Sequence, residues 1–539
     1  MTLNRYPQEV PKRHLVPQKV FTSDVPFPRF QNIAARLGVN SFNLSGGAIV
    51  DDFDNDHHLD IVTSTWDPAG QLRYFRSNAD GSYSDRTTEA GLLGLFGGLN
   101  LVQADYDNDG DLDFLVLRGA WLESNGSHPN SLVQNAGDGT FVDVTFAAGL
   151  GEVHYPTQTA SWGDYDNDGD LDLYVGNEHS AEIQAPSQLF RNNGDGTFTD
   201  IAREAGVENN KYTKGVVWGD FDGDRFPDIY VSNYFAPNRL YRNNGDSTFS
   251  DVAVKLGVTR PRGSFPAWFW DFDNDGVLDI YASSYTGRVG VLSAYHLGEK
   301  VKFEPACLYR GDGRGGFIEV ARSRNLTEPT LTMGSNFGDI DNDGYLDFYL
   351  GTGDPKIQSL MPNLMYINRD GKRFENVTMV GGFGHLQKGH GIAFADLDND
   401  GDADVFEQMG GALRGDEYGD ALYENPGFGN HWLSVKLVGT RSNRSAIGAQ
   451  IRVEIIEGAE ARSVYRHVNS GGSFGCNPLH QTVGLAKASA IRSVEVFWPT
   501  SEITQRFTNV GLDQIIQIVE GEPSFTRLKL QKLTLRAPE

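Results

Sequence analysis

Residues 164–172 read Asp164-Tyr-Asp166-Asn-Asp168-Gly-Asp170-Leu-Asp172, and this nine-residue motif decides the fold. The pattern Asp-x-Asp-x-Asp-x-x-x-Asp occurs seven times, with its first aspartate at positions 52, 105, 164, 220, 271, 339 and 396. Successive motifs start 53, 59, 56, 51, 68 and 57 residues apart. Such self-similarity at a nearly regular period indicates a repeat architecture, in which each repeat is one supersecondary unit.

Each repeat is expected to contain four short β-strands. The last aspartate of a motif opens an apolar, β-prone run such as Leu173-Tyr-Val175, and another apolar run precedes most motifs. The second half of the repeat carries a hairpin signal, an Asn-Gly-Asp-Gly turn within residues 189–200, and a close variant recurs within residues 240–251. Four-stranded units repeated around a ring form a β-propeller. The sequence therefore predicts an all-β fold with a seven-bladed β-propeller.

The two ends of the repeat region predict how the ring closes. Residues 30–39 match the end of a repeat but precede the first motif, whereas the seventh repeat lacks that ending after Asn425. We expect the N-terminal strand to complete the last blade, because closure removes two exposed sheet edges. The alternative is an open solenoid with capping ends.

The acidic motifs predict calcium loops, which we number 1 to 7, with positions 1 to 9 in each. Four carboxylates packed into nine residues repel one another, and a solvated loop has no need of the same spacing seven times. Calcium takes six to eight oxygens, and carboxylates at positions 1, 3 and 5, a backbone carbonyl at position 7 and a late carboxylate supply them. Gly stands at position 6 in five loops, but His57 and Arg225 replace it in loops 1 and 4, so those two sites are the less secure expectations.

We expect up to seven Ca²⁺ ions. The candidate metal-binding residues are Asp52, Asp54, Asp56 and Asp60; Asp105, Asp107, Asp109, Asp111 and Asp113; Asp164, Asp166, Asp168, Asp170 and Asp172; Asp220, Asp222, Asp224 and Asp228; Asp271, Asp273, Asp275 and Asp279; Asp339, Asp341, Asp343 and Asp347; and Asp396, Asp398, Asp400, Asp402 and Asp404.

Composition excludes some classes of partner. The 539 residues contain 46 Lys+Arg against 72 Asp+Glu, a formal net charge of −26, and no basic stripe of the kind that binds nucleic acid is visible. No apolar run approaches the roughly 18 residues of a transmembrane helix. Apolar residues make up 39% of the chain, which is enough for a sizeable core.

The chain divides into four predicted segments. Residues 1–21 are an N-terminal arm, residues 22–428 the propeller, residues 429–522 a small β-sandwich-like domain, and residues 523–539 a C-terminal tail. The third segment contains alternating or apolar runs at residues 432–438, 449–456, 493–498 and 515–519. It is expected either to pack against the propeller or to bind carbohydrate or protein.

The same segments carry a family resemblance. Residues 22–428 resemble the FG-GAP/VCBS repeats of integrin-α-type propellers. Residues 429–522 resemble the ASPIC/UnbV domain, through pieces such as residues 430–439, 471–474 and 494–499. Together they resemble the cartilage acidic protein 1 family, which implies secretion. Gln481-Thr482 and Pro499-Thr-Ser501 depart from the pattern of the family, so no function is carried over to those turns.

Strand connectivity sorts the loops between two faces. If each acidic loop joins strands 1 and 2 of a blade, it shares a face with the 3–4 turn, while the 2–3 and 4–1 connections lie on the opposite face. Those connections are longer and less repetitive, as functional loops commonly are. The candidate catalytic residues there are His154, Tyr155, His179, Tyr234, His385 and His390, and the candidate ligand-binding residues are Lys211, Lys214, Arg262 and Lys388.

Two functions remain open from the sequence. The first is a calcium-binding interaction module that recognises a protein, a glycan or a small ligand through the face opposite the metal loops. The alternative is an enzyme of the lyase, hydrolase or cyclase type, with His and carboxylate groups at the central channel. No Gly-x-Ser-x-Gly, His-Glu-x-x-His or P-loop motif occurs.

The expected location is extracellular or periplasmic. No signal peptide precedes Arg5, which by itself would predict a cytoplasmic protein. Weak calcium loops, however, fill where calcium is millimolar, as it is outside the cell.

Overall fold

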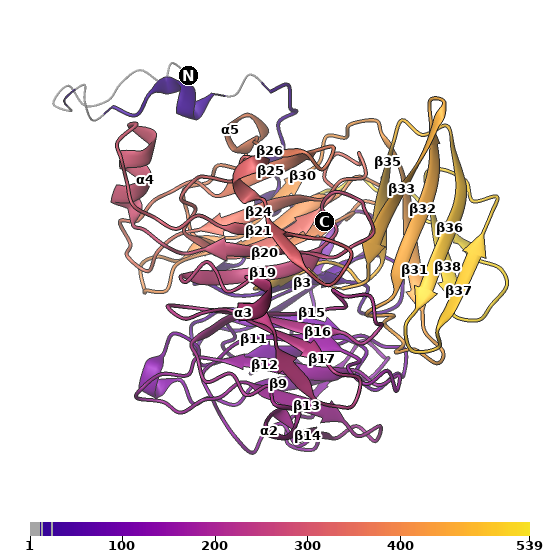
Figure 1. Cartoon of the computed structure of the whole chain (residues 1–539), viewed down its shortest axis with the longest axis horizontal. Coiled ribbons are helices and arrows are strands. Elements are labelled where there is room, and N and C mark those ends of the chain that lie inside the picture. Colours follow the sequence, from indigo (N-terminus) through magenta and orange to yellow (C-terminus); the bar gives the residue numbers. More distant parts are fainter. Residues whose placement is uncertain (1–10, 12–14, 23–24, 470, 539) are drawn as a thin grey trace.

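The computed structural model describes residues 11, 15–22, 25–469 and 471–538. Within them, seven antiparallel sheets form a ring, and two further sheets form a second unit beside it, drawn in yellow (Figure 1). The fold is all-β, as predicted. Of the predicted N-terminal arm, residues 1–10 and 12–14 lie outside the described residues.

Seven blades of four strands make up the propeller. Blade 1 contains β3 (Ala48–Asp51), β4 (Asp60–Thr63), β5 (Arg73–Ser77) and β6 (Tyr83–Asp85); blade 2 contains β7 (Asn100–Ala104), β8 (Asp113–Leu117), β9 (Ser131–Asn135) and β10 (Phe141–Asp143); blade 3 contains β11 (Thr157–Gly163), β12 (Asp172–Asn177), β13 (Gln188–Asn192) and β14 (Phe198–Asp200). Blade 4 contains β15 (Thr213–Gly219), β16 (Asp228–Asn233), β17 (Arg239–Asn243) and β18 (Phe249–Asp251); blade 5 contains β19 (Ser264–Trp270), β20 (Asp279–Ser284), β21 (Cys307–Gly311) and β22 (Phe317–Glu319); blade 6 contains β23 (Thr332–Gly338), β24 (Asp347–Thr352), β25 (Leu364–Arg369) and β26 (Arg373–Asn376).

Blade 7 joins the two ends of the propeller. Its strands β27 (Gly389–Ala395), β28 (Asp404–Met409) and β30 (Ala421–Glu424) are completed by β1 (Gln31–Asn32). β1 pairs antiparallel with β30, with Gln31 opposite Glu424. The ring is therefore closed by a strand from the N-terminal side of the chain, which leaves no open sheet edge at the join.

Short helical elements connect most blades. Helices α1 (Ala34–Leu37), α2 (Ala202–Ala205), α3 (Ala253–Leu256) and α5 (Thr378–Gly381) and the 3-10 helix η4 (Ala321–Arg324) follow the outermost strands. The remaining elements are β2 (Phe42–Asn43), β29 (Tyr418–Gly419), η2 (Gln18–Phe21), η3 (Glu123–Asn125) and α4 (Val289–His296).

Alternating side chains pack neighbouring blades together. In β12, Leu173 and Val175 join a buried cluster with the side chains of blade 2, whereas Tyr174 joins a cluster with those of blade 4. Successive side chains of a strand point to opposite faces of its sheet, so a single strand fills both interfaces. This explains why the strands that follow the acidic motifs read as continuous apolar runs.

The second unit, which we call the C-terminal domain, is a two-sheet sandwich. One sheet has the order β35 (Gln481–Ala486), β31 (His431–Val438), β38 (Gln514–Val519) and β39 (Thr526–Leu528). The other has the order β33 (Glu460–His467), β32 (Gln450–Glu457), β36 (Ala490–Trp498) and β37 (Ile503–Phe507). Trp498, Val453 and Ile516 lie in the core between them.

A segment of the C-terminal domain enters the centre of the propeller. We call residues 471–477 the plug; they contain β34 (Gly475–Cys476), which pairs in parallel with β3 of blade 1. The Phe474 side chain is fully buried, and its ring centroid lies 5.9 Å from that of Phe265 and 6.0 Å from that of Trp121. A Cβ atom at Gly475 would lie 2.2 Å from backbone atoms of Ile392, so the plug fits only because that position is glycine.

We expect the Phe474 side chain of the plug to contribute strongly to the stability of the fold. Phe474→Ala is expected to lower the free energy of unfolding by about 3–5 kcal/mol, because it leaves a cavity among packed rings. Chemical denaturation followed by tryptophan fluorescence measures the loss. Phe146→Ala is the matched control, since the side chain of Phe146 is 73% exposed. Equal stability of the two variants would contradict the role given to the plug.

Candidate metal centres on one face of the propeller

Each acidic motif forms a tight loop between the first two strands of a blade. In loop 2, the Asp105 carboxylate accepts hydrogen bonds from the backbone N–H groups of Asp109 (3.1 Å) and Gly110 (2.9 Å). Asn108 and Gly110 have positive φ angles of 61° and 101°, a backbone conformation that Gly and Asn adopt most readily. The position 1 carboxylates of loops 3 to 7 accept the equivalent two bonds, so six loops share one conformation.

The aspartate at position 9 anchors each loop to its blade. Asp113 is fully buried and accepts hydrogen bonds from the backbone N–H groups of Tyr106 (3.2 Å) and Asn135 (2.8 Å). It thereby ties position 2 of the loop to the third strand of the sheet. Asp172, Asp228, Asp279, Asp347 and Asp404 repeat this pattern in loops 3 to 7.

The carboxylates of one loop converge on a small volume. In loop 2, ligand atoms of Asp105, Asp107 and Asp113 all lie within 4.8 Å of one another, and loops 3, 4 and 5 group the same three positions. One oxygen at position 3 is buried without a hydrogen-bond donor in Asp107, Asp166, Asp222 and Asp273. Buried polar atoms in proteins are nearly always paired. A group of carboxylate oxygens, some of which lack a hydrogen-bond partner, is a ligand set that suits a hard cation such as Ca²⁺.

Electrostatics also favours a cation at these loops. Burial, together with the negative charges of Asp107 and Asp105, raises the pKa of Asp113 to about 9. Burial likewise raises the pKa of Asp105 to about 7, again with a contribution from neighbouring carboxylates. In loop 6 the pKa of Asp343 rises to about 9 for the same two reasons. Each cluster therefore requires positive charge at neutral pH, supplied either by protons or by a metal ion.

Asparagines at position 4 link the loops to one another. The Asn108 side chain donates hydrogen bonds to the Gly169 carbonyl (3.1 Å) and to the Asp170 carboxylate (3.0 Å) of the next loop. Asn55, Asn167, Asn274, Asn342 and Asn399 make corresponding links. In this ring of bonds the one step without a side-chain donor is loop 4, where Gly223 stands at position 4.

Sequence reasoning missed these asparagines as functional residues. Their signal was present, because Asn occupies position 4 in six of the seven motifs. A second unrecognised residue is the asparagine that ends the third strand: Asn135 donates to the Phe53 carbonyl of loop 1 (2.7 Å) as well as to Leu112 of its own loop. Asn192, Asn243, Asn368 and Asn425 repeat that bridge to the preceding blade.

Loop 1 departs from the other six. The Asp52 carboxylate lies beside two basic side chains, at 3.3 Å from Lys436 Nζ and 3.5 Å from His57 Nδ1. Arg76 pairs with both Asp54 and Asp56, as Arg310 does with the corresponding positions of loop 5, but among the described loops only loop 1 combines such an arginine with a lysine at position 1. The nearby carboxylate oxygens come from positions 1, 3 and 5, and Asp60 at position 9 is not in that group. Lys436 and Arg76 thus provide positive charge at loop 1.

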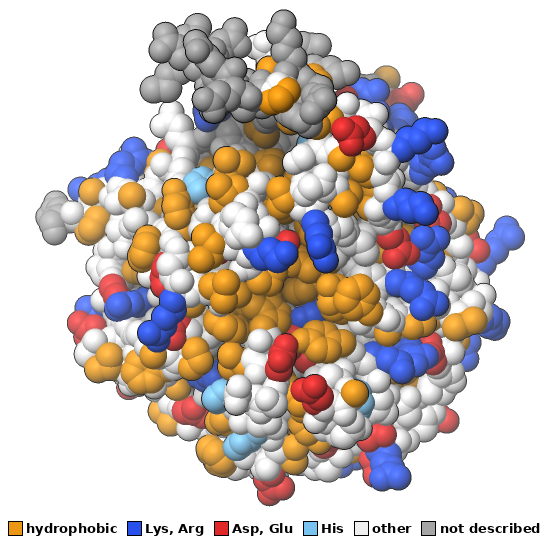
Figure 2. Space-filling view, turned by 90° about the vertical axis from the view of Figure 1, so that its left-hand side faces the viewer, with side chains coloured by type: hydrophobic (Ala, Val, Ile, Leu, Met, Phe, Trp, Pro, Cys, Tyr) orange, Lys and Arg blue, Asp and Glu red, His pale blue; other side chains and the backbone are white. Residues whose placement is uncertain are grey.

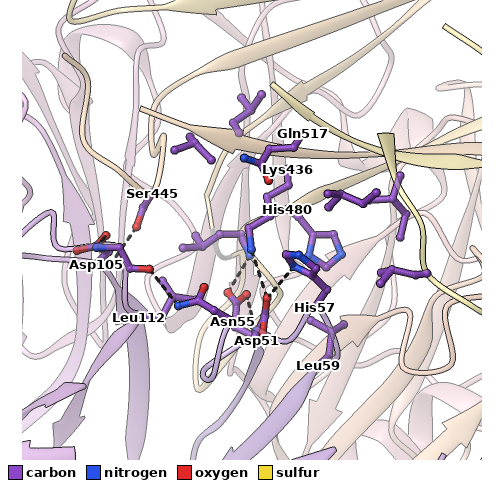
Figure 3. Close-up of a pocket in the computed structure, with 18 of the residues that line it drawn as sticks. Asp51, Asn55, His57, Leu59, Asp105, Leu112, Lys436, Ser445, His480 and Gln517 are labelled. Carbon is purple, nitrogen blue, oxygen red and sulfur yellow. Dashed lines mark hydrogen bonds and ion pairs between the residues drawn. The ribbon is translucent and has the colours of Figure 1, made fainter. Parts of the chain in front are cut away.

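A pocket separates loop 1 from the C-terminal domain. It has a volume of about 260 Å³. Figure 3 shows Lys436, His480 and Gln517 of the C-terminal domain facing His57, Asn55 and Asp51 of the propeller across it. Burial lowers the pKa of His480 to about 4, so this imidazole is neutral at pH 7.

The C-terminal domain contacts every acidic loop. Ser445 Oγ accepts the Asp105 N–H (3.0 Å), Thr500 Oγ1 donates to Asp164 (2.9 Å), and Arg466 pairs with Asp339 at 2.9 Å. Loop 4 contacts Pro499, loop 5 contacts Tyr465 and loop 7 packs against Trp432. The domain therefore covers the metal-loop face, and its contacts with the loops fix its position on that face.

The other predicted metal-binding positions have partners of their own. The position 5 carboxylates, such as Asp109, accept the N–H of position 7 at 2.8 Å. The side chains of Asp111, Asp170 and Asp402 at position 7 accept hydrogen bonds from Asn55, Asn108 and Asn342 of the preceding loop. Their backbone carbonyls, which the sequence assigned to the metal, stay a prediction.

The candidate catalytic residues lie on the opposite face but do not form one cluster. His154, His179 and His385 are half-buried and each hydrogen-bonds to backbone within its own connection. His390 is fully buried beside Phe474, with both ring nitrogens unpartnered, and burial lowers its pKa to about 3. Among the described residues, no hydrogen bond or ion pair joins two side chains of the set His154, Tyr155, His179, Tyr234, His385 and His390. Their catalytic role stays a prediction.

The candidate ligand-binding residues differ in exposure. Lys214 is buried in an ion pair with Glu178, and its Nζ also donates to Gln158 (2.9 Å). Lys388 is buried and pairs with Asp416 at 2.7 Å. Lys211 is half-buried and Arg262 is exposed. The ammonium groups of Lys214 and Lys388 already have partners, so the accessible candidates are Lys211 and Arg262.

Comparison with known sequences decides the family. The FG-GAP-like repeat profile matches residues 52–116, 120–175, 179–231, 221–282 and 357–407, just over half of the chain. The chain belongs to the FG-GAP-like repeat family. The profile named ASPIC and UnbV matches residues 439–524, which fall in the C-terminal domain.

Curated relatives extend the match. Cartilage acidic protein 1 of Homo sapiens is 25% identical over 523 residues, covering 89% of this chain and 72% of that protein. The Xenopus tropicalis protein of that name is 28% identical over 285 residues, covering 50% of this chain and 41% of that protein. This FG-GAP-repeat chain is homologous to cartilage acidic protein 1 across 89% of its length, as the sequence motifs indicated.

Solved structures are more distant. A structure of BBS1N in complex with ARL6DN has a TM-score of 0.41 and 10% identity, covering 71% of this chain and 93% of that one. A fungal lectin with a six-bladed propeller fold and a fucose recognition mode has a TM-score of 0.33 and 13% identity, covering 64% of this chain and 97% of that one. In the described part of this chain, no helix is long and apolar enough to cross a membrane.

The missing link at loop 4 gives a testable prediction. Gly223 has a φ of 76° and open space where a Cβ would stand, so Asn fits there and can reach loop 5. Gly223→Asn is expected to be more stable than Gly223→Ala by about 1–2 kcal/mol, because a new hydrogen bond forms and Asn tolerates this conformation better. Denaturant unfolding at saturating calcium measures the difference. Equal stability of the two variants would show that the hydrogen bonds between loops from the position 4 asparagines contribute nothing to the free energy of unfolding.

Proposed function

We propose that this protein is a calcium-stabilised interaction module that binds six Ca²⁺ ions, one in each of loops 2 to 7. The observation that carries the proposal is the buried position 3 oxygen that has no donor in Asp107, Asp166, Asp222 and Asp273. Bound calcium would take those oxygens together with carboxylates at positions 1 and 9, and would supply the positive charge that the clusters lack.

Loop 1 is excluded from this count. Lys436 and Arg76 pair with its carboxylates at positions 1, 3 and 5, whereas the arginines at loops 5 and 6 pair with only two of these positions in each loop. A dication in loop 1 would have to displace both side chains. The Asp52 carboxylate also accepts no N–H bond from positions 5 and 6 of its loop, unlike its counterparts. Six ions would cancel twelve of the 26 net negative charges.

Calcium would support binding indirectly, by stabilising the propeller that carries the binding face. The loops hold the inner strands of each blade, link neighbouring blades through the asparagines, and carry the C-terminal domain. The face opposite to them is left for partners. Figure 2 shows that face, on which apolar side chains gather in and around a central hollow.

Exposed apolar side chains support the choice of that face. The connections there expose Phe96, Phe235, Ile357, Leu360 and Leu386 by 47% to 73%. Contiguous apolar surface on a soluble protein commonly marks an interaction site. We place the protein outside the cell, where millimolar calcium fills sites of modest affinity.

Calcium stoichiometry tests the proposal. Equilibrium dialysis is expected to give six ions per chain for the native protein and five for Asp107→Ala, because Asp107 is a position 3 ligand of loop 2. Asp54→Ala, the same position in loop 1, is the matched control and should leave the count at six. A count that falls with Asp54→Ala but not with Asp107→Ala would overturn the assignment of the loops.

A further inference from the structure

A separate pocket opens between blades 1 and 2, among the connections on the face opposite to the metal loops. Its volume is about 340 Å³. Trp66, Phe96, Leu122 and Pro129 supply apolar walls, and Arg118 and His128 are its basic residues. Among the described residues that line it, none is acidic. In a chain with a net charge of −26, a basic pocket free of carboxylates is unusual.

Glycines keep the pocket from filling with side chains. Gly94, Gly97, Gly98 and Gly119 line it, and all four have positive φ angles. A Cβ at Gly119 would lie 1.9 Å from the Gly126 carbonyl oxygen, and one at Gly98 would lie 2.6 Å from Val116 Cγ1. Both positions therefore require glycine, and neither contributes a side chain to the cavity.

Hydrogen bonds hold the Arg118 side chain in place and leave its Nη2 group free to donate. Its Nε donates to the Phe96 carbonyl (2.8 Å), and its Nη1 donates to the Pro129 carbonyl (3.1 Å) and Ser131 Oγ (2.8 Å). These bonds use the Nε hydrogen and both Nη1 hydrogens, and Nη2 has no hydrogen-bond partner among the described residues. Nη2 is not among the buried unsatisfied atoms, so it is accessible.

The charge of Arg118 has no counter-ion in contact. No ion pair joins it to a carboxylate among the described residues, and Asp143 acts on it only through longer-range electrostatic attraction. Burial lowers the pKa of Arg118 to about 10, which leaves it cationic at neutral pH. A guanidinium without a counter-ion attracts an anion, and the free Nη2 group can donate a charge-assisted hydrogen bond to a carboxylate.

We propose that this cavity, the Arg118 pocket, binds a carboxylate attached to an apolar or aromatic group. The carboxylate would meet Nη2 of Arg118, and the apolar part would lie against Trp66 and Phe96. This deepens the proposed function, on which it rests only for the choice of face. The carboxylate could belong to a small acid or to the C-terminal residue of a peptide, since both present the same chemistry.

Calorimetric titration of the calcium-loaded full chain with 3-phenylpropionate tests the proposal, with quenching of tryptophan fluorescence as a second readout. The acid is expected to bind at least tenfold more tightly than 3-phenylpropionamide, which has the same shape without the charge. Arg118→Gln should abolish that preference, and Arg118→Lys should retain part of it. Arg262→Gln, which removes an exposed arginine that does not line this pocket, is the matched control and should bind as the native chain does.

A peptide that ends in phenylalanine distinguishes the two sources. Tighter binding of its free-acid form than of its amidated form would assign the pocket to chain ends, and binding of the small acid alone would assign it to free carboxylates. Equal affinity for 3-phenylpropionate and its amide, or no binding of either at millimolar concentration, would overturn the proposal even if Arg118→Gln fails to fold. Because calcium stoichiometry is measured separately, the two proposals can fail independently.

Discussion

Repulsion between buried carboxylates is the constraint on which the rest of the structure depends. In loops 2 to 5, oxygens from positions 1, 3 and 9 lie within 4.8 Å of one another at the end of the two inner strands. Such a group is unstable when fully ionised and uncompensated, because burial removes the water that would screen it. In loop 1, Lys436 and Arg76 compensate three of the aspartates directly. Compensating positive charge, from protons, basic side chains or a metal ion, is therefore a condition of the blade geometry.

The same loops connect the levels of the architecture. The aspartate at position 9 accepts a hydrogen bond from the third strand of its own blade, and the asparagine at position 4 donates to the next loop. The asparagine at the end of the third strand donates to the loop of the preceding blade. The C-terminal domain then adds contacts from above, such as Arg466 with Asp339, while its plug enters the channel. The metal-loop face is thus enclosed, which leaves the opposite face as the accessible surface of the propeller.

The sequence predicted the repeated elements well, because their signal is local. Aspartates spaced by two, with Gly at position 6 and a β-prone run after position 9, specify a loop between two strands wherever they occur. The overall fold followed from counting that unit. The homology to cartilage acidic protein 1 was also readable from short motifs.

The features that the sequence did not reveal are contacts across long separations. Lys436 is 384 residues from Asp52, so the sequence around loop 1 gives no sign that a lysine pairs with this aspartate. Phe474 reads as an ordinary aromatic residue until the plug is placed among Phe265, Trp121 and His390. Lys214 and Lys388 read as free basic residues because Glu178 and Asp416 are brought to them only by the fold.

Thermal unfolding with and without a calcium chelator tests the central claim most directly. If cations compensate the carboxylates of loops 2 to 7, chelation should lower the melting temperature by about 10 °C or more, since each saturated site contributes roughly 2–3 kcal/mol at a hundredfold excess over its dissociation constant. Added calcium should restore the original value, and added magnesium should do so poorly because it retains its waters. A melting temperature that is unchanged by chelation would contradict the account.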